Sequence, residues 1–277
     1  MQLFVEQLTN VDFSYLDPER GLVGETWWAG ATLDGALDEQ GMICDFGTVK
    51  KILRNWLDDE VDHRLLVPLR HPALTLQEHN DHIELTWRFS EHILQLSCPQ
   101  QALALVDAES IDASSVATWC RAQLQPFFPV NVEQLALTFT PEHIAGASYH
   151  YSHGLKKHDG NCQRIAHGHR SRIHIWLDNQ RNEALEQHWA ERWADIYLVS
   201  EEDIIDDQDG QLTTRYQSAQ GAFAMSLPSR ACYRMNTDTT VEFIAQHLAD
   251  AIKAEHPTQA VRVQAFEGVN KGAIASA

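Results

Sequence analysis

The sequence lacks long hydrophobic runs, paired cysteines and an excess of positive charge. No stretch of 18 or more apolar residues occurs among its 277 residues, so a membrane-spanning helix is not expected. The segment MQLFVEQLTNVDF has no basic region before an apolar run, so we expect no secretory signal. The five cysteines form no CxxC pair, and their odd number favours reduced thiols in a cytoplasmic protein over a disulfide framework.

The charge balance is strongly acidic, with a formal net charge of −18. A negative field of this size repels nucleic acid and anionic membranes, so neither is expected as a partner. Residues 201–210, EEDIIDDQDG, are predicted to form a solvated acidic loop. One region is locally basic and fits either a small anionic ligand or an ordinary solvated strand face. It contains Lys156, Lys157, Arg164, Arg170 and Arg172.

Apolar periodicity predicts helices alternating with pairs of strands. The clearest helix covers 46–61, with Asp45 as a candidate N-cap. Its apolar residues at helical spacing share one face: Val49, Ile52, Leu53, Trp56 and Leu57. The other expected helices are 239–254, with Asp238 or Thr239 as the cap, 110–124 and 182–194. The expected strands are 3–8, 24–35, 82–90, 92–97, 134–139, 171–177, 195–200 and 261–266. This pattern favours an α+β fold with antiparallel sheets.

An internal repeat becomes visible when Gly24 is aligned with Gly168. The segment VGETWWAGATLDG (23–35) then lies over HGHRSRIHIWLDN (167–179), and Phe13–Ser14–Tyr15 lies over Tyr151–Ser152–His153. Each half also has a late helix followed by a strand. We therefore predict two copies of one unit, residues 1–142 and 143–277.

Histidines gather in the second copy. Seven of the 15 lie between residues 143 and 174, and His167 and His169 share a strand face because side chains alternate along a strand. The positions aligned with His153, His167 and His169 in the first copy carry Tyr15, Val23 and Glu25, which could not supply three nitrogens. Three neutral imidazoles leave a fourth position open on zinc, as in a catalytic site. The alternative is a set of core or surface histidines, and His158 and His174 are interpreted as surface residues.

Two further features carry possible chemistry. Cys162 follows the loop sequence Asp-Gly-Asn and lies close to the histidines, so its thiolate could act as base or nucleophile. Asp62 and His63 stand where the first predicted helix ends, and a carboxylate next to an imidazole can orient the ring. Taken alone, the Asp-His pair also fits a solvated surface pair.

Taken together, these motifs resemble the 6-pyruvoyl tetrahydropterin synthase family, which includes 6-carboxytetrahydropterin synthase. The resemblance rests on GMICDFGTVK (41–50), on DHRLL (62–66), on a cysteine shortly before HGH, and on a C-terminal strand that ends in Glu267. It implies the tunnelling fold, in which each unit is an antiparallel four-stranded sheet with two helices on one face. It also implies a homo-oligomer, here a dimer or trimer of two-unit chains.

The resemblance further implies a role for each motif residue. His153, His167 and His169 match the zinc ligands, Cys162 the catalytic cysteine, and Asp62 and His63 the catalytic pair. Glu267 matches the glutamate that anchors the pterin, since a carboxylate accepts two parallel hydrogen bonds from a 2-amino-pyrimidinone edge. The implied substrate is 7,8-dihydroneopterin triphosphate.

This chain departs from the family's single-unit form. The zinc set, Cys162 and Glu267 lie in the second copy, whereas the Asp-His pair lies in the first. The second copy has no such pair near SLPSRACYRMNTD (226–238), and Thr140 stands at the first copy's anchoring position. We therefore expect one composite site with one zinc per chain, formed within a chain or between chains. The favoured reaction yields 6-carboxy-5,6,7,8-tetrahydropterin, acetaldehyde and triphosphate, as in queuosine biosynthesis. The alternatives are the 6-pyruvoyl reaction and a non-catalytic zinc- or pterin-binding paralogue.

Overall fold

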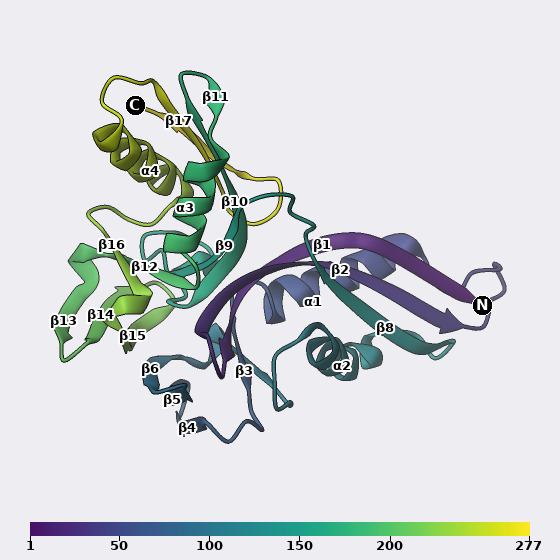
Figure 1. Cartoon of the computed structure of the whole chain (residues 1–277). Coiled ribbons are helices and arrows are strands. Elements are labelled where there is room, and N and C mark those ends of the chain that lie inside the picture. The colour runs from purple at the N-terminus through teal and green to yellow at the C-terminus, as the bar shows by residue number, and fades with distance from the viewer.

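The computed structural model describes all 277 residues and contains four helices and three main sheets (Figure 1). The helices are α1 (Phe46–Glu60), α2 (Ala113–Leu124), α3 (Glu183–Arg192) and α4 (Val241–Glu255). In the first half of the chain, residues 1–142, the strands are β1 (Gln2–Asp17), β2 (Gly21–Gly35), β3 (Leu65–Pro68), β4 (Leu74–His79), β5 (His82–Phe89), β6 (His92–Pro99), β7 (Leu103–Val106) and β8 (Val132–Pro141). In the second half, residues 143–277, they are β9 (Ser148–His153), β10 (His167–Leu177), β11 (Gln180–Arg181), β12 (Ile196–Ser200), β13 (Ile204–Gln208), β14 (Gln211–Ser218), β15 (Gly221–Pro228), β16 (Cys232–Met235), β17 (Val261–Phe266) and β18 (Gly272–Ser276).

Each half is built around its own sheet and two helices. In the first half the strand order is β7-β3-β1-β2-β8, and α1 and α2 share one hydrophobic core with this sheet. In the second half the order is β16-β12-β9-β10-β17-β18, with β11 paired to β10, and α3 and α4 bury their apolar faces in a second core. The predicted stripe of α1 faces the core: Val49, Leu53 and Leu57 are fully buried, whereas Ile52 and Trp56 pack against the same core and are only partly buried.

The prediction of four antiparallel strands per unit is only partly right. The first sheet has five strands, of which only β1, β2 and β8 pair antiparallel, and the second has seven, with β9, β10, β17 and β18 antiparallel and the short β11 paired to β10. Two short parallel strands extend each sheet on one side. β3 and β7 extend the first sheet, and β12 and β16 occupy the same places in the second. Each half carries an inserted three-stranded meander, β4–β6 in the first and β13–β15 in the second. The chain leaves the sheet for the meander after β3 or β12 and returns to it at β7 or β16.

The two meanders form a third sheet that joins the halves. Its order is β13-β14-β15-β6-β5-β4, and the junction pairs Met225 of β15 with Leu96 of β6 (Figure 1). The inward faces of both meanders bury a shared core that includes Trp87 and Phe223. The two halves are therefore joined by a continuous sheet and a common core.

The halves also meet directly where the repeat was aligned. The hydroxyl oxygens of Ser14 and Ser152 lie 2.7 Å apart in a hydrogen bond. A Cβ on Gly24 would lie 1.9 Å from the carbonyl oxygen of Tyr151, and a Cβ on Gly168 would lie 2.6 Å from the Cα of Gly24. Only glycine permits this approach, which brings β1 and β2 next to β9 and β10.

Two local predictions need correction. Residues 204–208 of the expected acidic loop form β13, an edge strand whose acidic side chains stay in solvent while its backbone pairs with β14. The N-cap of α4 is Thr240 rather than Asp238 or Thr239, because the Thr240 hydroxyl accepts from the N–H of Phe243. The N-cap of α1 is Asp45, as expected. None of the four helices is long and apolar enough to cross a membrane.

Candidate functional site

Three histidines converge at the end of the hairpin formed by β9 and β10. In the pairing of these two strands, His167 lies opposite His153 and His169 lies opposite Tyr151. Both histidines of the HxH motif on β10 are therefore paired with residues of β9. All three side chains are fully buried, and their ring centroids lie 4.4 to 5.7 Å apart. One nitrogen from each ring falls within 4.8 Å of the other two, a spacing that a single metal ion could bridge.

The hydrogen bonding of these rings fits a metal site. Nδ1 of His153 lies 2.9 Å from the carbonyl oxygen of Thr239, and Nδ1 of His167 lies 3.0 Å from that of Arg164. The Nε2 atoms of all three histidines are buried without a hydrogen-bond partner. Burial holds the pKa values of His153 and His167 well below the usual range, so these rings are neutral and their Nε2 lone pairs are free. Three such nitrogens suit zinc with one open position.

The Asp-His pair is held in a tight turn after α1. His63 adopts a left-handed conformation with φ of 56°, and its N–H donates to the carbonyl oxygen of Asp12 at 2.6 Å. The Asp62 carboxylate contacts Nδ1 of His63, and its other oxygen accepts from the N–H of Asp12 at 2.7 Å. These contacts aim the imidazole away from solvent and toward the second half of the chain.

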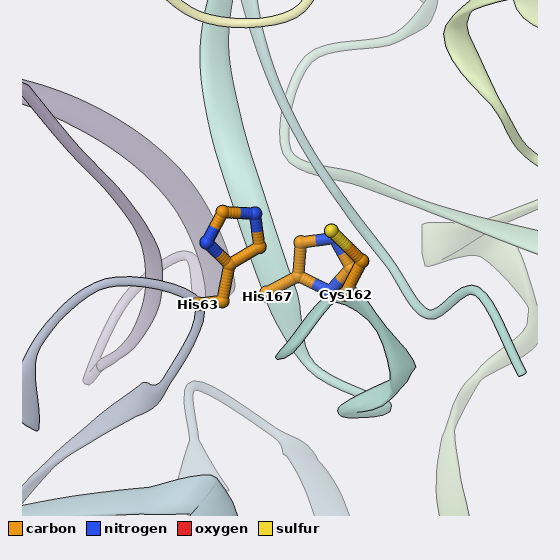
Figure 2. Close-up of side chains that lie close together, drawn as sticks. All are labelled: His63, Cys162 and His167. Carbon is orange, nitrogen blue, oxygen red and sulfur yellow. The ribbon is translucent and has the colours of Figure 1, made fainter. Parts of the chain in front are cut away.

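Cys162 meets this imidazole within the same chain. It lies on a single 3-10 turn, Asn161–Gln163, and its sulfur lies within 4.8 Å of ring nitrogens of His63 and His167 (Figure 2). The ring centroids of His63 and His167 are 5.0 Å apart. Burial lowers the pKa of His63, but hydrogen bonds to Asp62 and Cys162 outweigh it and raise the pKa to about 10. The pair from the first half and the cysteine from the second therefore form one cluster beside the three histidines.

Glu267 lies on the rim of the same cluster. It follows β17 directly, and its Oε1 is 3.7 Å from Nε2 of His169. Its N–H donates to the carbonyl oxygen of Lys271 at 3.0 Å, which closes the turn between β17 and β18. All seven residues expected from the sequence to form the site lie together: Asp62, His63, His153, Cys162, His167, His169 and Glu267.

The basic region is mostly paired with carboxylates of the protein itself. Lys156 pairs with Glu202 and Asp203, and Lys157 pairs with Glu202 and Asp238. Arg172 pairs with Glu142, and Arg170 donates to the carbonyl oxygen of Glu142. Lys271, outside this region, pairs with Asp12.

Arg164 is the member of the basic region nearest the Asp-His turn. Its side chain is buried, with Nη1 3.5 Å from the carbonyl oxygens of Asp62 and His63, and burial lowers its pKa to about 10. It thus contacts the backbone that carries the pair.

The equivalent place in the first half holds a different set of side chains. The β1–β2 register pairs Tyr15 with Val23 and Phe13 with Glu25, which matches the β9–β10 register of the histidines. Here Arg20 forms a bidentate ion pair with Asp195 and donates to the Tyr15 hydroxyl at 3.2 Å. This arrangement offers no three-nitrogen set.

The second half's counterpart of the Asp-His pair is not near residues 226–238, as the sequence alignment suggested. β3 pairs with β1 at Ser14, and β12 pairs with β9 at Ser152, so Asp195 corresponds to His63 and Ala194 to Asp62. Asp195 has the same left-handed backbone, with φ of 55°. The inserted meanders hid this equivalence in the sequence.

Sequence reasoning also missed two residues that contact the histidine cluster. Thr239 accepts from His153, and Oδ1 of the buried Asp12 lies 3.3 Å from Nδ1 of His169. In the repeat alignment Asp12 falls on His150, and this exchange of an acid for a base was the one available signal for Asp12. Nothing in the local sequence distinguishes Thr239.

Comparisons with known proteins show which family each half of the chain resembles. A family model described as 6-pyruvoyl tetrahydropterin synthase matches residues 11–148 and again residues 145–277. Solved structures of the Plasmodium vivax 6-pyruvoyltetrahydropterin synthase and of one of its variants are each 19% identical to the chain, and that of Plasmodium falciparum is 14% identical. Each match has a TM-score of 0.39 and covers 51% of this chain and 98% of the other.

The curated proteins include no match to this sequence. The two family-model matches together cover almost the whole chain, one in each half. The chain therefore belongs to the 6-pyruvoyl tetrahydropterin synthase family, as a form in which two copies are fused.

Proposed function

We propose that this protein is a zinc-dependent lyase that acts on 7,8-dihydroneopterin triphosphate. The observation that carries the proposal is the meeting, within one chain, of three buried histidines with free Nε2 atoms and the Asp62–His63–Cys162 cluster. A protein that only binds the metal ion would need the three histidines but not the Asp62–His63–Cys162 cluster. Two titratable partners next to an open metal position suit proton transfer during turnover.

The pterin ring would be held by Glu267. Its carboxylate lies at the edge of the histidine cluster and is partly exposed, so it can reach a ligand. A carboxylate accepts two parallel hydrogen bonds from the 2-amino-pyrimidinone edge, which fixes the ring's orientation as well as its position. The substrate side chain would then extend toward Cys162 and His63.

His153, His167 and His169 would hold the zinc ion through their Nε2 atoms. Zinc so bound supplies Lewis-acid polarisation of oxygen ligands. Cys162, as the thiolate, would take a proton from the substrate's side-chain carbon. His63, oriented by Asp62, would be the partner that receives or returns a proton. Because its pKa is raised to about 10, the ring would start as an imidazolium that gives up a proton, and it would receive one only after that.

The product we favour is 6-carboxy-5,6,7,8-tetrahydropterin, released with acetaldehyde and triphosphate in a reaction that also consumes one water molecule. This choice rests on the resemblance of the motifs GMICDFGTVK and DHRLL to the 6-carboxytetrahydropterin synthases. We further propose one zinc per chain, with residues 1–142 contributing the Asp-His pair and residues 143–277 the remainder. Chains would assemble as a dimer or trimer, because the main sheet of each half ends in edge strands that pair with no further strand of the chain on their outer side.

The test is to incubate the full chain, reconstituted with zinc, with 7,8-dihydroneopterin triphosphate and to identify products by mass. We expect 6-carboxytetrahydropterin, acetaldehyde and triphosphate. Recovery of 6-pyruvoyl tetrahydropterin without acetaldehyde would replace the favoured product with its alternative. Cys162→Ala should abolish turnover while zinc stays bound, whereas Cys44→Ala, outside the cluster, should retain full activity. If the wild-type protein binds the pterin but forms neither product, the protein is a binding paralogue.

A further inference from the structure

The third histidine of the cluster obtains its outer contact from the other half of the chain. Nδ1 of His153 and Nδ1 of His167 face backbone carbonyl oxygens of Thr239 and Arg164, both in the second half. Nδ1 of His169 has no hydrogen bond of good geometry, and Oδ1 of Asp12 lies 3.3 Å from it. Asp12 belongs to β1, in the first half.

The Asp12 carboxylate is well placed to accept from this ring. It is 1% exposed, and His169 is fully buried, so water does not compete for the contact. The Thr26 hydroxyl donates to Oδ1 at 2.6 Å, and Nζ of Lys271 donates to Oδ2 at 3.0 Å. These donors fix the orientation of the carboxylate and compensate its charge. Metal-bound imidazoles usually donate their second N–H to such an acceptor, which fixes the tautomer and raises ligand basicity.

The backbone of the same residue holds the Asp-His turn. The N–H of Asp12 donates to Asp62, and its carbonyl oxygen accepts from the N–H of His63. Asp12 therefore contacts a histidine of the second half with its side chain and the pair of the first half with its main chain. Arg164 also links the two parts, with its carbonyl oxygen on His167 and its guanidinium on the backbone of Asp62 and His63, but it belongs to the second half. Asp12 makes the corresponding link from the first half, with a carboxylate.

The equivalent position in the second half carries the opposite chemistry. There His150, which corresponds to Asp12, lies with Nδ1 3.9 Å from Oε2 of Glu25, which corresponds to His169. The acid and the base have exchanged places between the two copies. Asp12 on β1 thus faces His169, an expected metal ligand, whereas His150 on β9 faces Glu25, which is not one.

We propose that Asp12 is a positioning residue for the metal site, which accepts the Nδ1 hydrogen of His169 and directs its Nε2 toward the ion. The proposal rests on the proposed function, because it takes His169 as a ligand. It makes metal affinity in the second half depend on a side chain of the first half.

The experiment measures Co²⁺ binding by the full chain after removal of bound metal. Visible absorption of the cobalt complex reports ligand geometry, and competition with a chelator gives the dissociation constant. We expect Asp12→Ala to weaken Co²⁺ binding about 10- to 100-fold. Asp12→Asn, whose amide oxygen can still accept, should weaken binding less and restore most of the spectrum.

Two variants serve as matched controls. Asp59→Asn removes an exposed carboxylate near the end of α1 that contacts none of these histidines, and His150→Asn changes the equivalent residue of the other half. Both should bind Co²⁺ within about twofold of wild type, if the contact rather than overall charge matters. Melting of the metal-free proteins separates a folding defect from a binding defect, and Asp12→Asn tests the contact if Asp12→Ala does not fold.

The outcomes are distinguishable. If Asp12→Asn and Asp12→Ala both fold and both bind Co²⁺ as wild type does, with an unchanged spectrum, the positioning role is refuted and the metal site stands. If both controls weaken binding as much as Asp12→Ala, the effect is general and the role is again refuted. If the wild-type chain itself takes up no Co²⁺, the proposed metal site fails, and this inference fails with it.

Discussion

Replacing Glu25 with glutamine should stabilise the protein at pH 8 and leave its stability at pH 4 unchanged. Glu25 stands where the second half has His169, and it is 8% exposed. Burial raises its pKa from 4.5 to about 7, although the N–H of Thr26 and the charges of Arg170 and Arg20 oppose this shift. The folded protein therefore holds this carboxyl in its neutral form at a pH where the unfolded chain does not.

The sign and size of the effect follow from proton linkage. Between pH 4.5 and about 7 the unfolded chain loses the Glu25 proton while the folded chain keeps it. The unfolded state then binds fewer protons, so stability falls as pH rises through this window, and the loss is complete above it. A pKa difference of about 2.5 corresponds to about 3 kcal/mol. Glutamine cannot ionise and still offers an oxygen to Thr26, so we expect a gain of about 2 kcal/mol at pH 8.

Urea denaturation at pH 4, 6 and 8 with linear extrapolation measures the difference. Comparing wild type and variant at each pH cancels the titration of the other groups. Glu84→Gln, an exposed position on β5, is the control and should change stability by less than about 0.5 kcal/mol at every pH. The reasoning is refuted if Glu25→Gln has the same effect at pH 4 and pH 8, or if it destabilises the protein at pH 8.

Three further substitutions test contacts that stabilise the fold, two of them between the halves and one within the first half. Arg20→Leu removes the partly exposed ion pair with Asp195 and should cost about 1 kcal/mol in urea denaturation; no loss would mean that this pair does not stabilise the contact between the halves. Asp112→Ala removes the capping box of α2 and should cost about 1 kcal/mol in thermal unfolding, whereas the exposed Asp107→Ala should cost nothing measurable. Met225→Ala, in the core shared by both meanders, should cost about 2–5 kcal/mol in one cooperative transition, and a separate early transition would show that the shared sheet unfolds independently.

The sequence predicts the parts of the fold that have a strong period. The helix 46–61 shows its apolar stripe because one face packs on a sheet and the other meets water, and α1 follows it closely. The hairpin of β5 and β6 alternates for the same reason. The repeat alignment made Gly24 and Gly168 equivalent positions, and in the structure these two residues are also in contact with each other.

Other elements lack any such signal. β3 is buried on both faces and only four residues long. β9, with the sequence SYHYSH, looks polar because three of its residues, His150, Ser152 and His153, serve the site or the contact between the halves. The sheet that joins β6 to β15 depends on strands far apart in the chain, which no local pattern specifies. The acidic β13 reads as a loop because an edge strand can leave its side chains in solvent.

The candidate site shows the same division. That the three histidines lie together could be predicted for two reasons. His167 and His169 are two residues apart on a strand and therefore share a face, and the aligned positions of the first copy carry no histidine. That Cys162 meets His63 within the chain could not be predicted, because the approach depends on how the halves pack. Asp12 was missed for the same reason, since its partner lies on a strand of the other half.

The packing of the halves explains why one site can serve the whole chain. β1 and β2 lie against β9 and β10 around the Ser14–Ser152 contact, so the turn after α1 reaches the histidines of the second half. The reciprocal site would combine the turn after α3 with Tyr15, Val23 and Glu25. There Asp195 stands in place of His63 and pairs with Arg20, which fills the space with a salt bridge between the halves. Two identical units would form both places alike, whereas in the fused chain one place is occupied by an ion pair and the other brings together the residues of the candidate site.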